Sequence, residues 1–277
     1  MTATYQDIDV EFSHTDKLYF PEEGITKRDV LEYYERISGR LLPHLENRPV
    51  TLHRFPDGID SDGFYQKQSP DYFPHWIETI EVEKREDGEI QQLVNCKDVR
   101  TLLYLVNQGT LTFHPWLSEK DDLEKPTRAV IDLDTEGEQN DLVKKAALRV
   151  MDALEDKKQA FELCTTGSSG YHVIIPLKAE RTFDDIRKEL QDFCKELAGD
   201  FPELLTVEHR KNKRQGRIYL DVARNAYAQT AVAPFCLRAL PEAPVATPID
   251  PDELSRNDME PRRYTLKNIF RRLAQKG

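Results

Sequence analysis

The sequence of 277 residues contains no long hydrophobic run. A membrane-spanning helix needs roughly 20 consecutive apolar residues, and no segment approaches that length. The N-terminus, MTATYQDIDVEF, has neither the basic start nor the apolar stretch of a signal peptide. These two absences predict a cytoplasmic protein with no membrane partner.

Cysteine is scarce and scattered. The four cysteines form neither a CxxC pair nor a Cys/His cluster at zinc-ligand spacing; they are Cys96, Cys164, Cys194 and Cys236. We expect reduced, mostly buried thiols and no structural zinc. Repeats and low-complexity linkers are also missing, and a chain of this length suits one large domain or two modest ones.

Basic residues are fewer than acidic residues: the chain has 39 Lys and Arg against 50 Asp and Glu, which gives a net charge of −11. The distribution is uneven, because residues 201–277 hold 14 basic and 9 acidic residues, a balance of +5. Five basic residues and no acid occupy 209–217 (HRKNKRQGR). Such a run alone is more often a solvated loop, but its position beside an acid-bearing strand favours contact with nucleic acid.

Hydrophobic periodicity predicts mixed helices and strands. Thr26 and Asp29 have the capping-box pattern that starts a helix. Further helices are predicted over 97–106, 140–157 and 182–198, and strands over 49–55, 128–134, 160–164, 171–177 and 217–222. The hairpin-like strand pairs favour an α+β fold over a strictly parallel α/β fold. The Pro-rich stretch 241–251 is expected to cross the surface toward a C-terminal tail.

Three aspartates carry the main chemical signal. Asp132 and Asp134 alternate with apolar residues in RAVIDLD, so both carboxylates point to one strand face. Asp221 lies in RIYLDV, and strand pairing could bring it to the same place. Close carboxylates repel unless a cation lies among them, and oxygen ligands suit Mg²⁺ or Mn²⁺. A DxD pair alone is more often a turn or capping pair, but three such acids suit two-metal phosphoryl transfer.

Three further features have both a functional and a structural interpretation. The loop 165–170 (TTGSSG) can cradle phosphates with its hydroxyls and amides, or it is a plain glycine turn. His114 is either a site residue or a core histidine. Arg238 is either a phosphate clamp or a surface charge.

The motifs, taken in order, resemble the primase-like polymerase domain of bacterial ligase D and its stand-alone relatives in end joining. The resemblance covers almost the whole chain, through DKLYFP, LPH, RP, FYQK, FHPW, DLD, GYH, LD, AP, LR and YTLKN. It implies the archaeo-eukaryotic primase core, in which a catalytic sheet like that of the RNA-recognition fold packs with a second sheet and flanking helices.

The resemblance also implies an activity and a nucleotide site. It implies a polymerase that fills gaps and extends primers at DNA breaks from ribo- or deoxyribonucleoside triphosphates. Asp132, Asp134 and Asp221 would bind two Mn²⁺ or Mg²⁺ ions. The nucleotide-binding candidates are His114, Thr166, Ser168, Ser169, His172, Arg224 and Arg238.

DNA contacts follow from the same resemblance. Lys17 and Lys27 would bind the 5′-phosphate of the downstream strand, helped by the backbone N–H groups of the helix that starts after Thr26. Phe64 and Tyr65 would stack at the template. The remaining DNA-binding candidates are Arg54, Lys67, Arg210, Lys211, Lys213 and Arg214.

The resemblance implies a single domain over residues 1–277 with the organisation and partners of end joining. Residues 1–120 would bind the DNA end, 121–240 would form the catalytic sheet, and 241–277 would pack on the core. Partners would be gapped DNA with a 5′-phosphate, Ku and a DNA ligase, with the protein associated with the nucleoid.

Four positions depart from the pattern of the relatives. Thr166 replaces a common Ser, Ser169 a common Lys or Arg, Tyr65 a Phe, and His53 a common lysine. The lost charge could be restored by Arg224 or by the basic run 209–217.

The sequence disfavours three other functions. A replicative primase subunit is disfavoured by the missing zinc cluster and by the presence of Lys17 and Lys27. A non-catalytic DNA-end binding module would not need three clustered carboxylates. A metal-dependent phosphohydrolase usually has histidine-rich ligands, which the sequence lacks.

Overall fold

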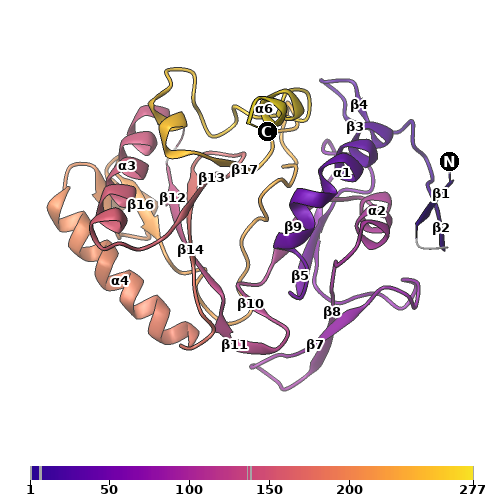
Figure 1. Cartoon of the computed structure of the whole chain (residues 1–277), viewed down its shortest axis with the longest axis horizontal. Helices are drawn as coiled ribbons and strands as arrows, with labels where there is room; N and C mark the ends of the chain where they lie inside the picture. The colour runs from indigo at the N-terminus through magenta and orange to yellow at the C-terminus, as the bar shows by residue number, and fades with distance from the viewer. Residues whose placement is uncertain (1, 6–7, 136, 138, 277) are drawn as a thin grey trace.

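Two main sheets with helices packed against them make up the computed structural model, which describes residues 2–5, 8–135, 137 and 139–276 (Figure 1). The mixture of antiparallel sheets and helices confirms the predicted α+β class. None of the described helices is long and apolar enough to cross a membrane. All four cysteines are free and buried, as expected.

The six-stranded sheet occupies the second half of the chain. Its order is β15 (Leu205–Thr206), β16 (Ile218–Asp221), β12 (Arg128–Asp134), β14 (Tyr171–Pro176), β13 (Glu162–Thr165) and β17 (Thr247–Ile249). Every pair is antiparallel except β15 with β16. Two helices, α3 (Asn140–Asp156) and α4 (Phe183–Asp200), lie together on one side of this sheet (Figure 1). The opposite side is therefore left to the functional residues.

The second sheet belongs to the first half of the chain. β5 (Val50–Arg54) pairs with β6 (Phe64–Gln66), β8 (Ile90–Val94) and β9 (Thr110–Pro115), and β8 pairs with β7 (Thr79–Glu83). Helix α1 (Lys27–Leu41) starts at Thr26, whose capping box with Asp29 is confirmed. Helix α2 (Val99–Asn107) is capped by Asp98 and packs on α1.

Shorter elements connect these parts. They are β1 (Thr2–Tyr5), β2 (Ile8–Glu11), β3 (Leu18–Phe20), β4 (Ile25–Thr26), η1 (Leu42–His44), β10 (Ser118–Glu119), β11 (Asp122–Pro126), α5 (Lys211–Arg214), η2 (Pro251–Ser255) and α6 (Ile269–Lys276).

The prediction that 241–251 crosses the surface was wrong. Ala243, Val245 and Ala246 are buried, and β17 extends the sheet by pairing with β13. Pro248 is tolerated in β17 because this is an edge strand, where a missing N–H leaves no ladder partner unpaired. The chain then reaches α6, where Phe270 contacts Tyr33 of α1.

A buried ion-pair cluster holds this C-terminal segment. Glu253 accepts hydrogen bonds from Arg272 at 2.8 Å and from the Tyr264 hydroxyl at 2.6 Å, and it also pairs with Lys276. Burial alone would raise the pKa of Glu253, but these hydrogen bonds outweigh it and hold that pKa well below its ordinary value.

We therefore expect Glu253→Gln to lower the free energy of unfolding at pH 7 by about 3 kcal/mol, because Arg272 loses its buried partner. Because the pKa of Glu253 is lower in the folded chain than in the unfolded chain, its ionised form stabilises the fold at pH values above its ordinary pKa of about 4.3. This stabilisation is lost as the pH falls below that value. The difference between wild type and variant in urea unfolding should therefore shrink below about pH 4. Glu196→Gln, at an exposed pair with Lys157, is the control and should change stability by less than about 1 kcal/mol. Equal effects of both changes would contradict this account.

Candidate active site

The register of three neighbouring strands builds the centre of the site. Asp132 on β12 lies directly opposite Asp221 on β16 and opposite His172 on β14. Opposed residues of antiparallel strands share a face, with Cβ atoms about 4.5–5.5 Å apart. Strand pairing thus brings Asp221 beside Asp132, as the sequence predicted.

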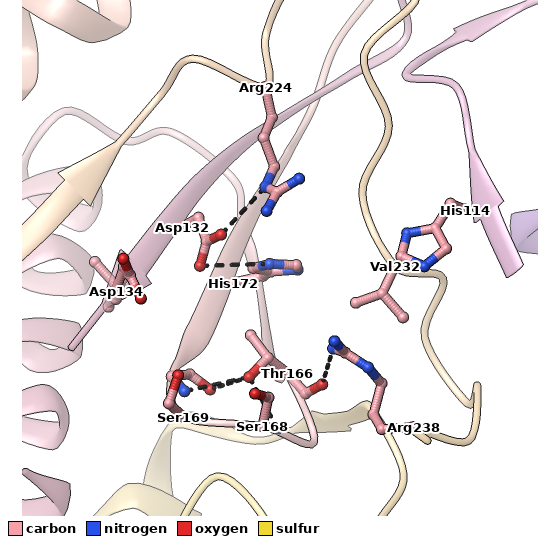
Figure 2. A pocket seen from close by; sticks show the side chains of 12 residues that line it. His114, Asp132, Asp134, Thr166, Ser168, Ser169, His172, Arg224, Val232 and Arg238 are labelled. Carbon is pink, nitrogen blue, oxygen red and sulfur yellow. Dashed lines mark hydrogen bonds and ion pairs between the residues drawn. The ribbon is translucent and has the colours of Figure 1, made fainter. Parts of the chain in front are cut away.

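Asp132 is held by two basic side chains. Its carboxylate lies 3.2 Å from Arg224 Nε and 3.5 Å from His172 Nε2 (Figure 2). Burial would raise the pKa of Asp132, but His172 and Arg224 together lower it to about 2. Asp132 is therefore ionised at physiological pH.

Asp134 is held by an arginine from the basic run. Arg214 Nη1 donates to Asp134 Oδ2 at 3.0 Å, and its guanidinium lies over the Tyr219 ring, 4.3 Å from the centroid. The Arg214 side chain is buried, and its other nitrogens donate to the backbone carbonyls of Glu208 and His209. Arg214 was predicted to contact DNA, but the structure places it inside the protein.

The three carboxylates do not converge on one point. Asp221 accepts a hydrogen bond from the backbone N–H of Ala223 at 2.8 Å, and Asp134 is turned toward Arg214. Within the described residues, no group of three or more His, Cys, Asp or Glu side chains is arranged to hold a metal ion. The three aspartates therefore lie on neighbouring strands, but their carboxylates do not point to a common metal position.

The loop between β13 and β14 is closed by its own threonine. The Thr166 hydroxyl donates to the Gly170 carbonyl and accepts from the N–H groups of Ser168 and Gly170. Arg238 Nη1 donates to the Thr166 carbonyl at 2.7 Å. The Thr166 hydroxyl, predicted to serve the triphosphate, makes hydrogen bonds within the loop, whereas the hydroxyls of Ser168 and Ser169 make no hydrogen bond to any described residue.

One cavity of about 170 Å³ unites the predicted nucleotide-binding residues. It is lined by Asp132 and Asp134 and by all seven candidates: His114, Thr166, Ser168, Ser169, His172, Arg224 and Arg238. In Figure 2, His114 and Arg238 lie across the cavity from the aspartates. Asp221 does not line the cavity.

His114 is both buried and part of this cavity. Its Nε2 atom has no hydrogen-bond partner within the described residues. Burial, together with the charge of Arg238, lowers the pKa of His114 well below its ordinary value, so the imidazole is neutral. A neutral ring with an unpaired nitrogen can exchange a hydrogen bond with a ligand.

A second cavity, of about 200 Å³, brings Lys17, Lys27 and Arg54 together. Lys17 Nζ lies 2.7 Å from Asp57, and Lys27 Nζ donates to the Ser13 carbonyl at 2.7 Å. Burial, and then the charge of Lys17, lowers the pKa of Lys27 to about 8. The two lysines predicted to act as a pair are thus close enough to influence each other.

The backbone N–H groups of α1 are not available to a ligand, which corrects the sequence prediction. The N–H groups of Lys27 and Arg28 donate to the carbonyls of Lys17 and Thr15, and that of Asp29 donates to Thr26 Oγ1. A phosphate in this cavity would therefore meet side chains rather than the helix terminus.

The other DNA-binding candidates fall into two groups. Arg54 is buried and donates to the Gln108 carbonyl and to Tyr72. The exposed candidates are Phe64, Tyr65, Lys67, Arg210, Lys211 and Lys213. Phe64 and Tyr65 are 46% and 60% exposed, which is unusual for aromatic residues and leaves part of each ring open to a stacking base.

The family model of the LigD primase-polymerase domain matches residues 26–277. The chain belongs to this family. It is 31% identical over 274 residues to the bifunctional non-homologous end joining protein LigD of Bacillus subtilis, covering 97% of this chain and 43% of that protein. It is 29% identical to the multifunctional LigD of Mycolicibacterium smegmatis, covering 97% of this chain and 35% of that protein. The chain thus spans less than half the length of these curated relatives.

A solved structure agrees with this assignment. The polymerase domain of Mycobacterium tuberculosis ligase D in complex with DNA matches with a TM-score of 0.90, 27% identity, and coverage of 97% of this chain and 95% of that one. The match confirms the predicted fold. As a LigD primase-polymerase domain, the chain is a metal-dependent nucleotidyltransferase of the polymerase class.

Some residues of the site in this LigD-family domain were not predicted. Tyr219 lies opposite Asp134, Asp57 pairs with Lys17, and Thr135 donates to the Ser169 carbonyl. Only the strand register and the folded loops bring these residues to the site. The alternation of RIYLDV does place Tyr219 and Asp221 on one strand face, which is a signal for Tyr219.

We expect Gly170→Ala to disrupt the site, because a Cβ there would lie 2.0 Å from the Leu133 carbonyl oxygen of β12. The atoms that this Cβ would meet belong to the Leu133 backbone, so no flexible side chain can move aside. The free energy of unfolding should therefore fall by about 1–3 kcal/mol, and primer extension should drop. Gly199→Ala in α4 is the control, since nothing lies within 4 Å of its Cβ. Denaturant unfolding that shows no loss for Gly170→Ala beyond the control would disprove this packing argument.

Proposed function

We propose that this domain is a DNA-dependent DNA/RNA polymerase that fills gaps and extends primers at double-strand breaks in non-homologous end joining. The observation that carries the proposal is the strand register that sets Asp132 between His172 and Asp221, beside a cavity lined by every nucleotide-binding candidate. The DNA-bound ligase D polymerase domain supports DNA as the partner.

We infer that two divalent ions, Mg²⁺ or Mn²⁺, bind at Asp132, Asp134 and Asp221. The donors fit: all three are carboxylates, two of them are opposed across one strand pair, and Asp132 stays ionised. Ions held by these carboxylates would supply Lewis-acid chemistry for nucleotidyl transfer, lowering the pKa of a primer 3′-hydroxyl and stabilising the charge of the leaving pyrophosphate. Asp134 and Asp132 would exchange Arg214 and Arg224 for these ions, so the two arginines keep the acidic site neutralised beforehand.

Different residues of the cavity would bind different parts of a nucleoside triphosphate. Arg238 and Arg224 supply positive charge toward the phosphates, and the hydroxyls of Ser168 and Ser169 can donate to phosphate oxygens. Neutral His114 lies across the cavity and offers a hydrogen bond to the sugar or base (Figure 2).

The DNA end would occupy the first half of the chain. Lys17 and Lys27 would hold the downstream 5′-phosphate, while exposed Phe64 and Tyr65 stack on the template and Lys67 contacts its backbone. Arg210, Lys211 and Lys213 would follow the phosphates near the primer. Arg54 would serve indirectly by fixing the wall of the phosphate cavity.

The wider setting is proposed from the relatives. Their names place them in non-homologous end joining, which supports a DNA ligase and Ku as partners and an association with the nucleoid. Residues 1–120 would act on the DNA end, 121–240 on catalysis, and 241–277 as structural support.

Asp134→Ala should lower primer extension on a gapped duplex with Mn²⁺ by about a hundredfold or more, since several kcal/mol of charge stabilisation are lost. DNA binding should survive, because carboxylates repel phosphate. Asp152→Ala, an exposed carboxylate on α3, is the matched control and should extend normally. Robust extension by Asp134→Ala would remove the aspartates from the mechanism.

The double change Lys17→Ala with Lys27→Ala should abolish discrimination between a gapped duplex with a downstream 5′-phosphate and one with a 5′-hydroxyl. We expect a wild-type preference of roughly tenfold or more, the scale of one or two charge-assisted hydrogen bonds. Lys188→Ala with Lys195→Ala, two exposed lysines of α4, matches the charge change. Fluorescence anisotropy on the two duplexes measures the ratio, and a wild type indifferent to the phosphate would favour a primase instead.

A further inference from the structure

His53 lies beside the exposed Tyr65, and both rings are near His114 of the nucleotide cavity. It stands directly opposite Tyr65 in the β5–β6 register, and the two rings are stacked 4.0 Å apart at 7°. A parallel stack at this spacing fixes both the height and the tilt of the Tyr65 ring. One face of Tyr65 is therefore held by His53, while the side chain remains 60% exposed.

The stack continues toward the nucleotide site. The His114 ring lies edge-on to Tyr65 at 5.5 Å and 6.2 Å from His53. His53 is itself backed by Phe55 at 4.5 Å. These rings connect the exposed aromatic surface to the cavity that contains Asp132.

His53 acts in this stack as an uncharged ring. Burial, and then the charge of Arg238, lowers its pKa to about 4, so it is neutral at physiological pH. Within the described residues, no hydrogen bond or ion pair engages its side chain. Its interactions are ring contacts, which a flat apolar ring could replace and a flexible chain could not.

We propose that His53 is the positioning residue for the template: by holding Tyr65 flat, it sets the surface on which the template base opposite the incoming nucleotide stacks. The inference rests on the proposed function and extends it, because it names the residue that links template position to the nucleotide cavity. The contribution of one aromatic pair corresponds to about a two- to tenfold change in the occupancy of the stacked position.

The test places 2-aminopurine at the first unpaired template position of a gapped duplex with a 5′-phosphate, because stacking quenches its fluorescence. Wild type and His53→Phe should quench strongly. His53→Ala and His53→Lys should lose roughly half of the quenching or more, with Tyr65→Ala as the reference for full loss. His75→Ala, an exposed histidine, is the matched control and should behave as wild type.

Two further readouts separate positioning from folding. Thermal unfolding should show His53→Ala folded, and duplex affinity should stay within about threefold of wild type because the phosphate cavity is untouched. KM for the incoming nucleotide should rise about two- to tenfold in His53→Ala and recover in His53→Phe.

The outcomes are distinct. Quenching by His53→Ala equal to wild type, or failure of His53→Phe to restore it, would overturn the role of His53. A wild-type domain that binds the duplex without quenching would overturn the stacking role of Tyr65 and, with it, that of His53. Quenching that depends on His53 in a domain unable to extend primers would support the positioning role and refute the proposed polymerase function.

Discussion

The antiparallel register of β12 with β14 and β16 is the constraint on which the site depends. It sets Asp132 opposite His172 on one side and Asp221 on the other. A slip of one residue would turn these side chains toward α3 and α4 and expose Ile131 and Leu133. The register also brings Gly170 against the Leu133 carbonyl, so the phosphate loop and the aspartates are fixed by the same strand pairing.

Charge compensation is the second requirement of this arrangement. Clustered carboxylates in a partly buried place need cations nearby. Arg224 and Arg214 come from the segments around β16, and each reaches one aspartate of β12. Arg214 is the buried member of the basic run 209–217, in which Arg210, Lys211 and Lys213 are exposed. The run therefore connects the solvent-exposed basic surface to the acidic site. The same run explains why a chain of net charge −11 has a basic C-terminal portion.

The sequence predicted the features that local rules determine. The alternation of apolar residues in 128–134 gave β12 with the expected bounds, and Thr26 with Asp29 marked the start of α1. The nucleotide-binding candidates came from the family resemblance and not from local rules, and all of them line one cavity. The bounds of β12 and the start of α1 could be predicted because they depend only on the alternation of residues in a strand and on a helix cap.

Features that depend on long-range contacts escaped prediction. The burial of Arg214 depends on Asp134, 80 positions away. The N–H groups of α1 are used by carbonyls of the preceding loop, which no capping pattern encodes. The Pro-rich stretch became β17 because β13 offered a free edge, so tertiary pairing outweighed local composition.

The number of divalent ions bound by the domain is the most direct test of the central claim. Mn²⁺ can be counted by electron paramagnetic resonance, with a gapped primer–template and a non-hydrolysable nucleoside triphosphate present. Wild type should bind two ions per chain, and the double variant Asp132→Asn with Asp221→Asn should bind fewer. Two ions retained in that double variant, or none bound by wild type, would contradict this claim.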